Sequence, residues 1–460
     1  MMKYQDDLIS IDEQDTYVNI HPVQDFYDGK MYYGLMNNGA DSVVNSDGEI
    51  LSLTQMKNRG FNLIVDKISN SRFPLSLINT NQLNLTIALD QIFFAVNDYF
   101  KKYLYLKDHR YYDVLTAWSI GTYIFKIFPS YPYLHFHAER GSGKTAALTL
   151  LKHICFNGNS SSYITRATLY RLVHSELSTL GIDEAEHFSS NSRNKDNSII
   201  EVLKSGYSES GVALVQNEDF SNTLKLSTYC PKAFAGIESL DSVLRDRTIR
   251  IPIIRKPDRI KLEPYSTKDK YWQQYMATLR ANLYYVGLKF ANEIKDIYQI
   301  LPERPEMESI TNRHFELWSP LIAIAEVMEN GGSGGAFSQG IIELAKLDLE
   351  TKEHRDEYED NGLSILKELL YIIGDECYDY NIKQLGRYAE VTTDELLDKF
   401  HERGIIPEDW KKRDLSTWLV SRELASIKSS NSVRRYLLDR DGIYEFQQSY
   451  FPNYDPQIED

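Results

Sequence analysis

The sequence has few cysteines, no long apolar run and no secretory leader. Its three cysteines, Cys155, Cys230 and Cys377, are scattered and form neither a CxxC pair nor a zinc-ligand spacing. This argues against a disulfide framework and fits a reducing compartment. No uninterrupted apolar stretch approaches the roughly 20 residues that cross a bilayer, and the polar N-terminus contains no signal-peptide core. We therefore expect a cytoplasmic protein without a membrane partner.

Positive charge is also scarce. The 460 residues include 51 Lys and Arg but 66 Asp and Glu, so the formal charge is −15. Such a chain is not an obvious polyanion binder, and any contact with nucleic acid must come from local basic surface or from a channel formed by several copies. The length allows roughly two to four domains.

The most informative stretch runs from Tyr133 to Leu151, YLHFHAERGSGKTAALTLL. An apolar strand, a glycine-rich turn and a helix in this order are typical of a phosphate-binding loop. The glycines let backbone N–H groups approach phosphate oxygens, and the helix N-terminus adds partial positive charge. Ala138 replaces the usual first glycine of GxxxxGK[ST] and is small enough for that bend.

This loop predicts ATP and Mg²⁺ as ligands. Lys144 is expected to reach the β- and γ-phosphates, and the Thr145 hydroxyl to bind Mg²⁺. The predicted nucleotide contacts are Glu139, Arg140, Gly141, Ser142, Gly143, Lys144, Thr145 and Ala146.

A second ATPase motif follows along the chain. The apolar run 177–182 leads into Asp183 and Glu184, which is the Walker B pattern. We expect Asp183 to hold Mg²⁺ through water and Glu184 to orient and deprotonate the attacking water, since phosphoryl transfer depends mainly on positioning and charge stabilisation. His135 and His137 are interpreted as ordinary strand residues, because no third metal ligand is near them.

Two further features of the core concern partners. The β runs 211–215 and 223–227 predict a hairpin with an acidic tip, where Lys225 is the candidate DNA contact. The segment LDSVLRDRTIRIPI, residues 240–253, begins the most basic stretch of the chain. An arginine from such a stretch can act in trans on the ATP of a neighbouring subunit.

The patterns divide the chain into five predicted regions. They are a small β-rich N-terminal domain, a helical connector, a nucleotide-binding core, a helical lid and a C-terminal winged helix, over residues 1–80, 81–130, 131–262, 263–375 and 376–460.

The winged helix is predicted from helices at 393–403 and 415–428, followed by β runs at 433–438 and 443–446 around an Asp-Gly turn. Arg434 and Arg435 are candidate phosphate contacts there, and a protein-docking winged helix fits equally well.

The order of motifs resembles that of AAA+ ATPases with a hairpin inserted before the sensor-1 strand, which include superfamily 3 and minichromosome-maintenance (MCM) helicases. The likeness is to the MCM-like replication-initiation helicases of mobile elements and phages, over about residues 110–330. It rests on the phrases SGYSESG, YCPKAFAGIESL, LRDRTIRIPI and ITNRHFELWSPLIAIAE. The resemblance implies an α/β P-loop AAA+ core, ATP hydrolysis, a homo-oligomer in the form of a hexameric ring, and single-stranded or forked DNA as partner.

The resemblance also assigns residues. Arg247 stands where MCM proteins keep the arginine finger, with Arg245 as its rival, and Arg313 stands where they keep a sensor-2 arginine that also reaches across the subunit boundary. The sensor-1 asparagine is replaced by Glu238 and Ser239, so sensor 1 stays unassigned. The acidic balance and the acidic hairpin tip leave an alternative open: an AAA+ remodelling or regulatory ATPase that acts on a protein.

Overall fold

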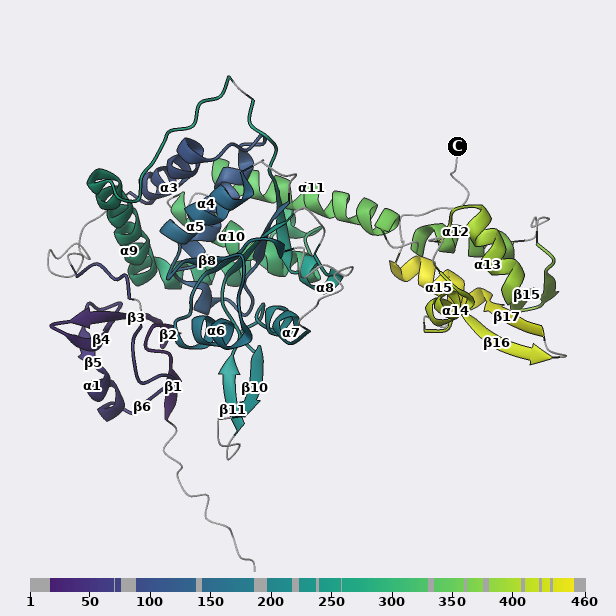
Figure 1. Cartoon of the computed structure of the whole chain (residues 1–460), viewed down its shortest axis with the longest axis horizontal. Helices are drawn as coiled ribbons and strands as arrows, with labels where there is room; N and C mark the ends of the chain where they lie inside the picture. Colours follow the sequence, from purple (N-terminus) through teal and green to yellow (C-terminus); the bar gives the residue numbers. More distant parts are fainter. Residues whose placement is uncertain are drawn as a thin grey trace, which may run out of the picture. The chain divides into compact units, whose positions relative to one another are not determined.

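The computed structural model describes most of the chain and divides it into two compact units, residues 1–346 and 347–460 (Figure 1). The described residues are 17–69, 71–75, 88–137, 143–185, 197–216, 223–236, 240–257, 259–329, 335–359, 362–374, 380–406, 410–421, 424–430 and 433–450. Among these, no helix combines the length and the apolar character that a bilayer crossing requires.

A five-stranded parallel sheet forms the centre of the first unit, in the order β13-β7-β12-β9-β8. The strands, in that order, are Thr248–Pro252, Tyr133–His137, Lys232–Gly236, Leu180–Ile182 and Asn159–Ser161. Because every pairing is parallel, all carboxyl ends lie at one edge, which is where open α/β sheets bind ligands. This mixed α/β architecture is compatible with a P-loop core.

Helices surround this sheet (Figure 1). Those of the first unit include α3 (Leu89–Tyr103), α4 (Arg110–Gly121), α5 (Lys144–Ile154), α6 (Arg166–Tyr170), α7 (Asn197–Ser205), α8 (Ser242–Arg245), α9 (Lys270–Ile300) and α10 (Asn312–Met328). Helix α11 (Ala336–Glu359) crosses the division between the units. In α3 the buried apolar residues recur at helical spacing; they are Leu89, Ile92, Phe93, Val96, Tyr99 and Phe100.

The N-terminal strands join the same hydrophobic core. An antiparallel sheet contains β2 (Gln24–Tyr27), β3 (Lys30–Asn37), β4 (Ala40–Asn45) and β5 (Ile50–Ser52), while β1 (Val18–Ile20) pairs with β6 (Phe61–Leu63) beside the short helix α1 (Leu53–Asn58). The Gln24 amide donates to the carbonyl of Thr122 at 3.3 Å, and the Tyr33 hydroxyl donates to that of Tyr123. These strands are therefore fixed to the helices that precede the phosphate loop.

The predicted hairpin is confirmed. Strands β10 (Val212–Gln216) and β11 (Thr223–Ser227) pair antiparallel and form a sheet of their own, separate from the central one (Figure 1). The acidic tip, residues 217–220, lies outside the described residues.

The second unit has a four-stranded antiparallel sheet in the order β14-β15-β17-β16. Its strands are Lys383–Leu385, Tyr388–Thr392, Val433–Asp439 and Ala425–Ser430, and its helices α12 to α15 are Gly362–Ile373, Thr393–Glu402, Lys412–Ser421 and Arg440–Tyr450. The helix predicted from residue 393 is confirmed.

Two details of the predicted wing are wrong. Residues 425–428 are strand rather than helix, because β16 pairs along its whole length with β17. Residues 443–446 are helix rather than strand: Ile443 and Phe446 are buried at a spacing that suits one helix face, and Asp441 stabilises the first turn of α15. The hairpin of this unit is therefore formed by β16 and β17, and Asp441-Gly442 lies in α15 and not in its turn.

Candidate nucleotide-binding site

The predicted phosphate loop lies at the carboxyl edge of the central sheet. Strand β7 ends at His137, and α5 begins at Lys144 with Gly143 as its N-cap. Gly143 has φ +106°, a conformation that L side chains rarely adopt, so the residue before the lysine has to be glycine. Residues 138–142, which include Glu139, Arg140, Gly141 and Ser142, lie outside the described residues, and Ala146 is an exposed residue of α5.

The two ATPase motifs meet in the structure. The Thr145 hydroxyl donates to a carboxylate oxygen of Asp183 at 2.7 Å. Thr145 is in the helix that follows β7, and Asp183 directly follows β9. These two strands are not neighbours, since β12 lies between them. It forms because α5 packs against β9, where a Cβ on Gly181 would lie 3.4 Å from the side chain of Leu148.

Glu184 has a strained backbone. Its φ is +54°, in the left-handed region, and its N–H donates to the Asp183 carboxylate at 3.0 Å. A non-glycine residue in this region costs of the order of 1–3 kcal/mol, and such strain is found most often at functional sites. Because of this backbone conformation, the chain turns at Glu184, which is exposed, and does not continue in the direction of strand β9.

The side chains of Thr145 and Asp183 fit the surroundings of one Mg²⁺, because a hydroxyl oxygen and a carboxylate are the kinds of donor that Mg²⁺ takes and their hydrogen bond of 2.7 Å holds them together. Thr145 would bind the ion directly, and Asp183 would hold it through water. No group of three His, Cys, Asp or Glu side chains in the described part of the chain is arranged to hold a metal. Mg²⁺ in nucleotide sites usually has only one or two protein ligands, because phosphate oxygens and water molecules provide the others.

His135, on the strand that enters the loop, is a buried neutral imidazole. Burial lowers its pKa to about 3, and the nearby charges of His137, Arg250 and Lys144 act in the same direction.

The predicted trans arginines lie at the amino ends of the sheet strands, opposite to the carboxyl ends where the phosphate loop begins. Arg247 immediately precedes β13, and its carbonyl accepts from the N–H of Tyr133, the first residue of β7. Because Tyr133 and His137 are the two ends of β7, Arg247 is separated from the phosphate-loop edge by about 13 Å of strand. Arg245 ends α8 just before it.

Arg313 joins this group from far along the sequence. Its guanidinium carbon lies 4.9 Å from the ring centre of Tyr207, and that of Arg247 lies 5.9 Å from the same ring. The Arg313 Nε is 3.5 Å from the carboxylate of Asp246, next to Arg247. The structure therefore brings Arg247 and Arg313 together and adds Tyr207, which our sequence analysis did not assign although it lies within the phrase SGYSESG.

The predicted DNA contacts are in two different places. Lys225 is exposed on β11, paired across the hairpin with Leu214, whose side chain is 71% exposed. Arg434 and Arg435 are neighbours on β17, so they point to opposite faces of its sheet. Arg434 is exposed, whereas Arg435 is 3.4 Å from the carboxylate of Glu390. The two arginines thus do not form one basic face.

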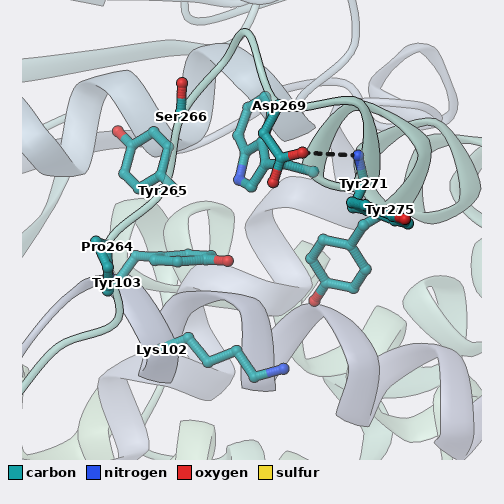
Figure 2. Close-up of a pocket in the computed structure, with 9 residues that line it drawn as sticks. Lys102, Tyr103, Pro264, Tyr265, Ser266, Asp269, Tyr271 and Tyr275 are labelled. Atoms are coloured by element: carbon teal, nitrogen blue, oxygen red, sulfur yellow. Dashed lines mark hydrogen bonds between the residues drawn. The ribbon is translucent and has the colours of Figure 1, made fainter.

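An open aromatic pocket lies elsewhere in the first unit (Figure 2). It is formed by the end of α3, the start of α9 and the segment before α9, and it is lined by Lys102, Tyr103, Pro264, Tyr265, Ser266, Asp269, Tyr271, Trp272 and Tyr275. The predicted nucleotide contacts that the structure describes, Gly143 to Ala146, are not among the residues that line this pocket.

Comparisons with known proteins give little guidance. No protein-family model and no curated protein matches the chain. A solved structure described as the SCCmec type IV Cch active helicase is similar at 12% identity over 91% of this chain and 79% of that chain, with a TM-score of 0.36. The apo A form of the NrS-1 C-terminal region is similar at 11% identity over 89% and 96%, with a TM-score of 0.34.

The JCV helicase is similar at 14% identity over 60% of this chain and 71% of that chain, with a TM-score of 0.25. All of these TM-scores are below 0.5, so the assignment that follows is based on the residues of the site itself.

Proposed function

We propose that this chain is an AAA+ ATPase that works as a ring of identical subunits and moves or unwinds DNA, as a replication-initiation helicase of a mobile element or phage. The observation that carries the proposal is the contact of Thr145 with Asp183 at 2.7 Å, which joins the two ATPase motifs at the carboxyl edge of the sheet. The phrases that resemble MCM-like helicases supply the DNA-directed part of the proposal.

Each residue of this edge has a role in ATP hydrolysis. The phosphate loop holds the triphosphate, with Lys144 at the β- and γ-phosphates. Thr145 and Asp183 would hold Mg²⁺, which neutralises charge that develops on the phosphate oxygens. Glu184, turned by its strained backbone, orients the attacking water and accepts its proton.

The positions of the arginines support an assembly in which each ATP site is shared by two subunits, as in a ring. A finger must touch the transferred phosphate, and Arg247 lies at the other edge of its own sheet. Arg247 and Arg313 therefore act on the ATP of a neighbouring subunit, as an arginine supplied in trans can do. Arg245, at the end of α8, is the alternative finger.

The separate hairpin is proposed to contact DNA through Lys225 inside the ring, with the second unit as an accessory contact through Arg434. One observation favours the protein-remodelling alternative: the described part of the hairpin exposes Leu214 and Val212, at 71% and 40%, beside a single exposed lysine. Exposed apolar surface of this kind is typical of sites that bind another protein.

The test compares ATP hydrolysis with strand displacement on forked DNA. Lys144→Ala should reduce hydrolysis to background, whereas Lys152→Ala, near the other end of α5, should leave it close to the wild-type rate. Wild-type protein should hydrolyse ATP faster with single-stranded DNA and displace a strand. Hydrolysis without displacement, and without any effect of DNA, would favour the protein-remodelling ATPase; equal activity of the two lysine variants would refute the phosphate-loop assignment.

A further inference from the structure

Two guanidinium groups share one buried aromatic ring at the amino edge of the sheet. Tyr207 is 2% exposed, and the guanidinium carbons of Arg247 and Arg313 lie 5.9 and 4.9 Å from its ring centre. A cation within about 6 Å of a ring centre is attracted by the negative face of the ring. The two arginines are 66 positions apart, by subtraction of their numbers in the sequence, so the ring is what their surroundings have in common.

The ring itself is held from several sides. It meets the ring of Tyr133 edge-on, with centroids 5.8 Å apart at 90°. The Tyr207 carbonyl accepts from the N–H of Tyr131 at 3.1 Å. The preceding carbonyl, of Gly206, accepts from the buried ammonium of Lys232 at 3.2 Å. A Cβ on Gly206 would lie 2.1 Å from the backbone oxygen of Thr228 and 2.4 Å from that nitrogen, so glycine is needed for this close approach. Tyr207 is thus fixed to the starts of both β7 and β12.

The other contacts of the two arginines are hydrogen bonds and ion pairs at the surface. Arg247 donates to the carbonyl of Val243 at 2.8 Å, within the same turn of chain. Arg313 pairs with Glu316 one turn along its own helix and, at 3.5 Å, with Asp246. Both guanidiniums are only partly buried. Partly exposed ion pairs fix geometry weakly, whereas a buried ring of fixed orientation restricts the plane in which each guanidinium lies.

We propose that Tyr207 is a positioning residue that orients Arg247 and Arg313 as one unit toward the ATP of the neighbouring subunit. This inference rests on the proposed function, since it names the residue that prepares the arginines of that same shared site. Tyr207 lies beside Tyr133, the first residue of β7, whereas the phosphate loop of its own chain follows the last residue of that strand. Its loss should therefore lower kcat and leave the affinity for ATP nearly unchanged.

The experiment uses full-length variants, alone and mixed. Tyr207→Leu should lower kcat at least tenfold with ATP affinity within about twofold of wild type, and Tyr207→Phe, which keeps the ring, should recover most of that loss. Mixed with Glu184→Gln, the Tyr207→Leu variant should regain activity, because some interfaces then combine an intact cradle on one chain with intact arginines on the other. Tyr229→Leu is the control for loss of a buried tyrosine, since Tyr229 is bonded to the carbonyls of Phe125 and Phe128.

The outcomes separate the two levels of the proposal. If Arg247→Ala mixed with Glu184→Gln regains activity but Tyr207→Leu mixed with Glu184→Gln does not, Tyr207 supports its own chain and the positioning role is refuted. The positioning role is also refuted if Tyr207→Leu has the wild-type kcat. It is refuted as well if Tyr229→Leu, mixed with Glu184→Gln, regains as much activity as Tyr207→Leu does in the same mixture. If Arg247→Ala retains full activity, or also fails to regain it on mixing, the shared site of the proposed function is refuted instead.

Discussion

Acid should destabilise the first unit through its buried histidines, and His21 provides a contribution that can be measured separately. Its Nδ1 accepts from the N–H of Val23 at 3.3 Å, and its Nε2 is 2.7 Å from the carbonyl of His174, to which it donates as the neutral tautomer. A second proton would have to go on Nδ1, where it breaks the first hydrogen bond and places a charge in a site that is 2% exposed. Burial, reinforced by the nearby charge of Lys126, lowers the pKa of His21 to about 3 from 6.5.

The sign and size of the effect follow from linkage. Because the unfolded chain binds the proton more tightly than the folded one, stability is lost as the pH falls below about 6.5 and the loss continues down to about pH 3. At about pH 5, a pKa of about 3 in the folded state and about 6.5 in the unfolded state correspond to roughly 2 kcal/mol of lost unfolding free energy.

Urea unfolding of full-length protein, followed by tryptophan fluorescence at about pH 7.5 and pH 5, measures this loss. In His21→Gln, whose amide can still reach the His174 carbonyl, the loss between the two pH values should be smaller than in wild type by roughly 2 kcal/mol. The exposed His109, replaced in the same way, is the control. The reasoning fails if the His21 variant and the His109 variant lose equal stability on acidification.

Two other substitutions test separate parts of the structure. Arg247→Ala should lower kcat by about 10³-fold or more with little change in ATP binding. Steady-state hydrolysis and titration with a fluorescent ATP analogue measure the two quantities. The control is Arg59→Ala, at an exposed arginine paired with Glu49, and a comparable loss of kcat in that variant would contradict the assignment of Arg247 as the arginine finger. Lys232→Met should destabilise the first unit by roughly 3 kcal/mol, because the buried carbonyls of Thr228 and Cys230 lose the ammonium donor and that of Gly206 keeps only the N–H of Cys230 at 3.4 Å. Unchanged urea unfolding would show that the carbonyls find other donors.

Local chemistry made part of the fold predictable. The turn after β3 could be read from Asn38 and Gly39, which both take positive φ. The helix from residue 393 follows a threonine whose side chain caps the N–H of Glu395. The C-terminal wing was misjudged because Asp-Gly suits a hairpin turn and also the first turn of a helix. The burial of Ile443 and Phe446 against their own core decided for the helix.

The sequence by itself determined which residues we propose to bind a triphosphate, because a phosphate loop and an Asp-Glu pair are each defined by neighbours in the chain. Tertiary structure decided what lies together. It placed Thr145 2.7 Å from Asp183 across an intervening strand, and it placed Arg247 and Arg313 on the ring of Tyr207 at the far edge of the sheet. Such contacts depend on strand order and on the packing of helices against the sheet, and spacing along the chain does not record either of these.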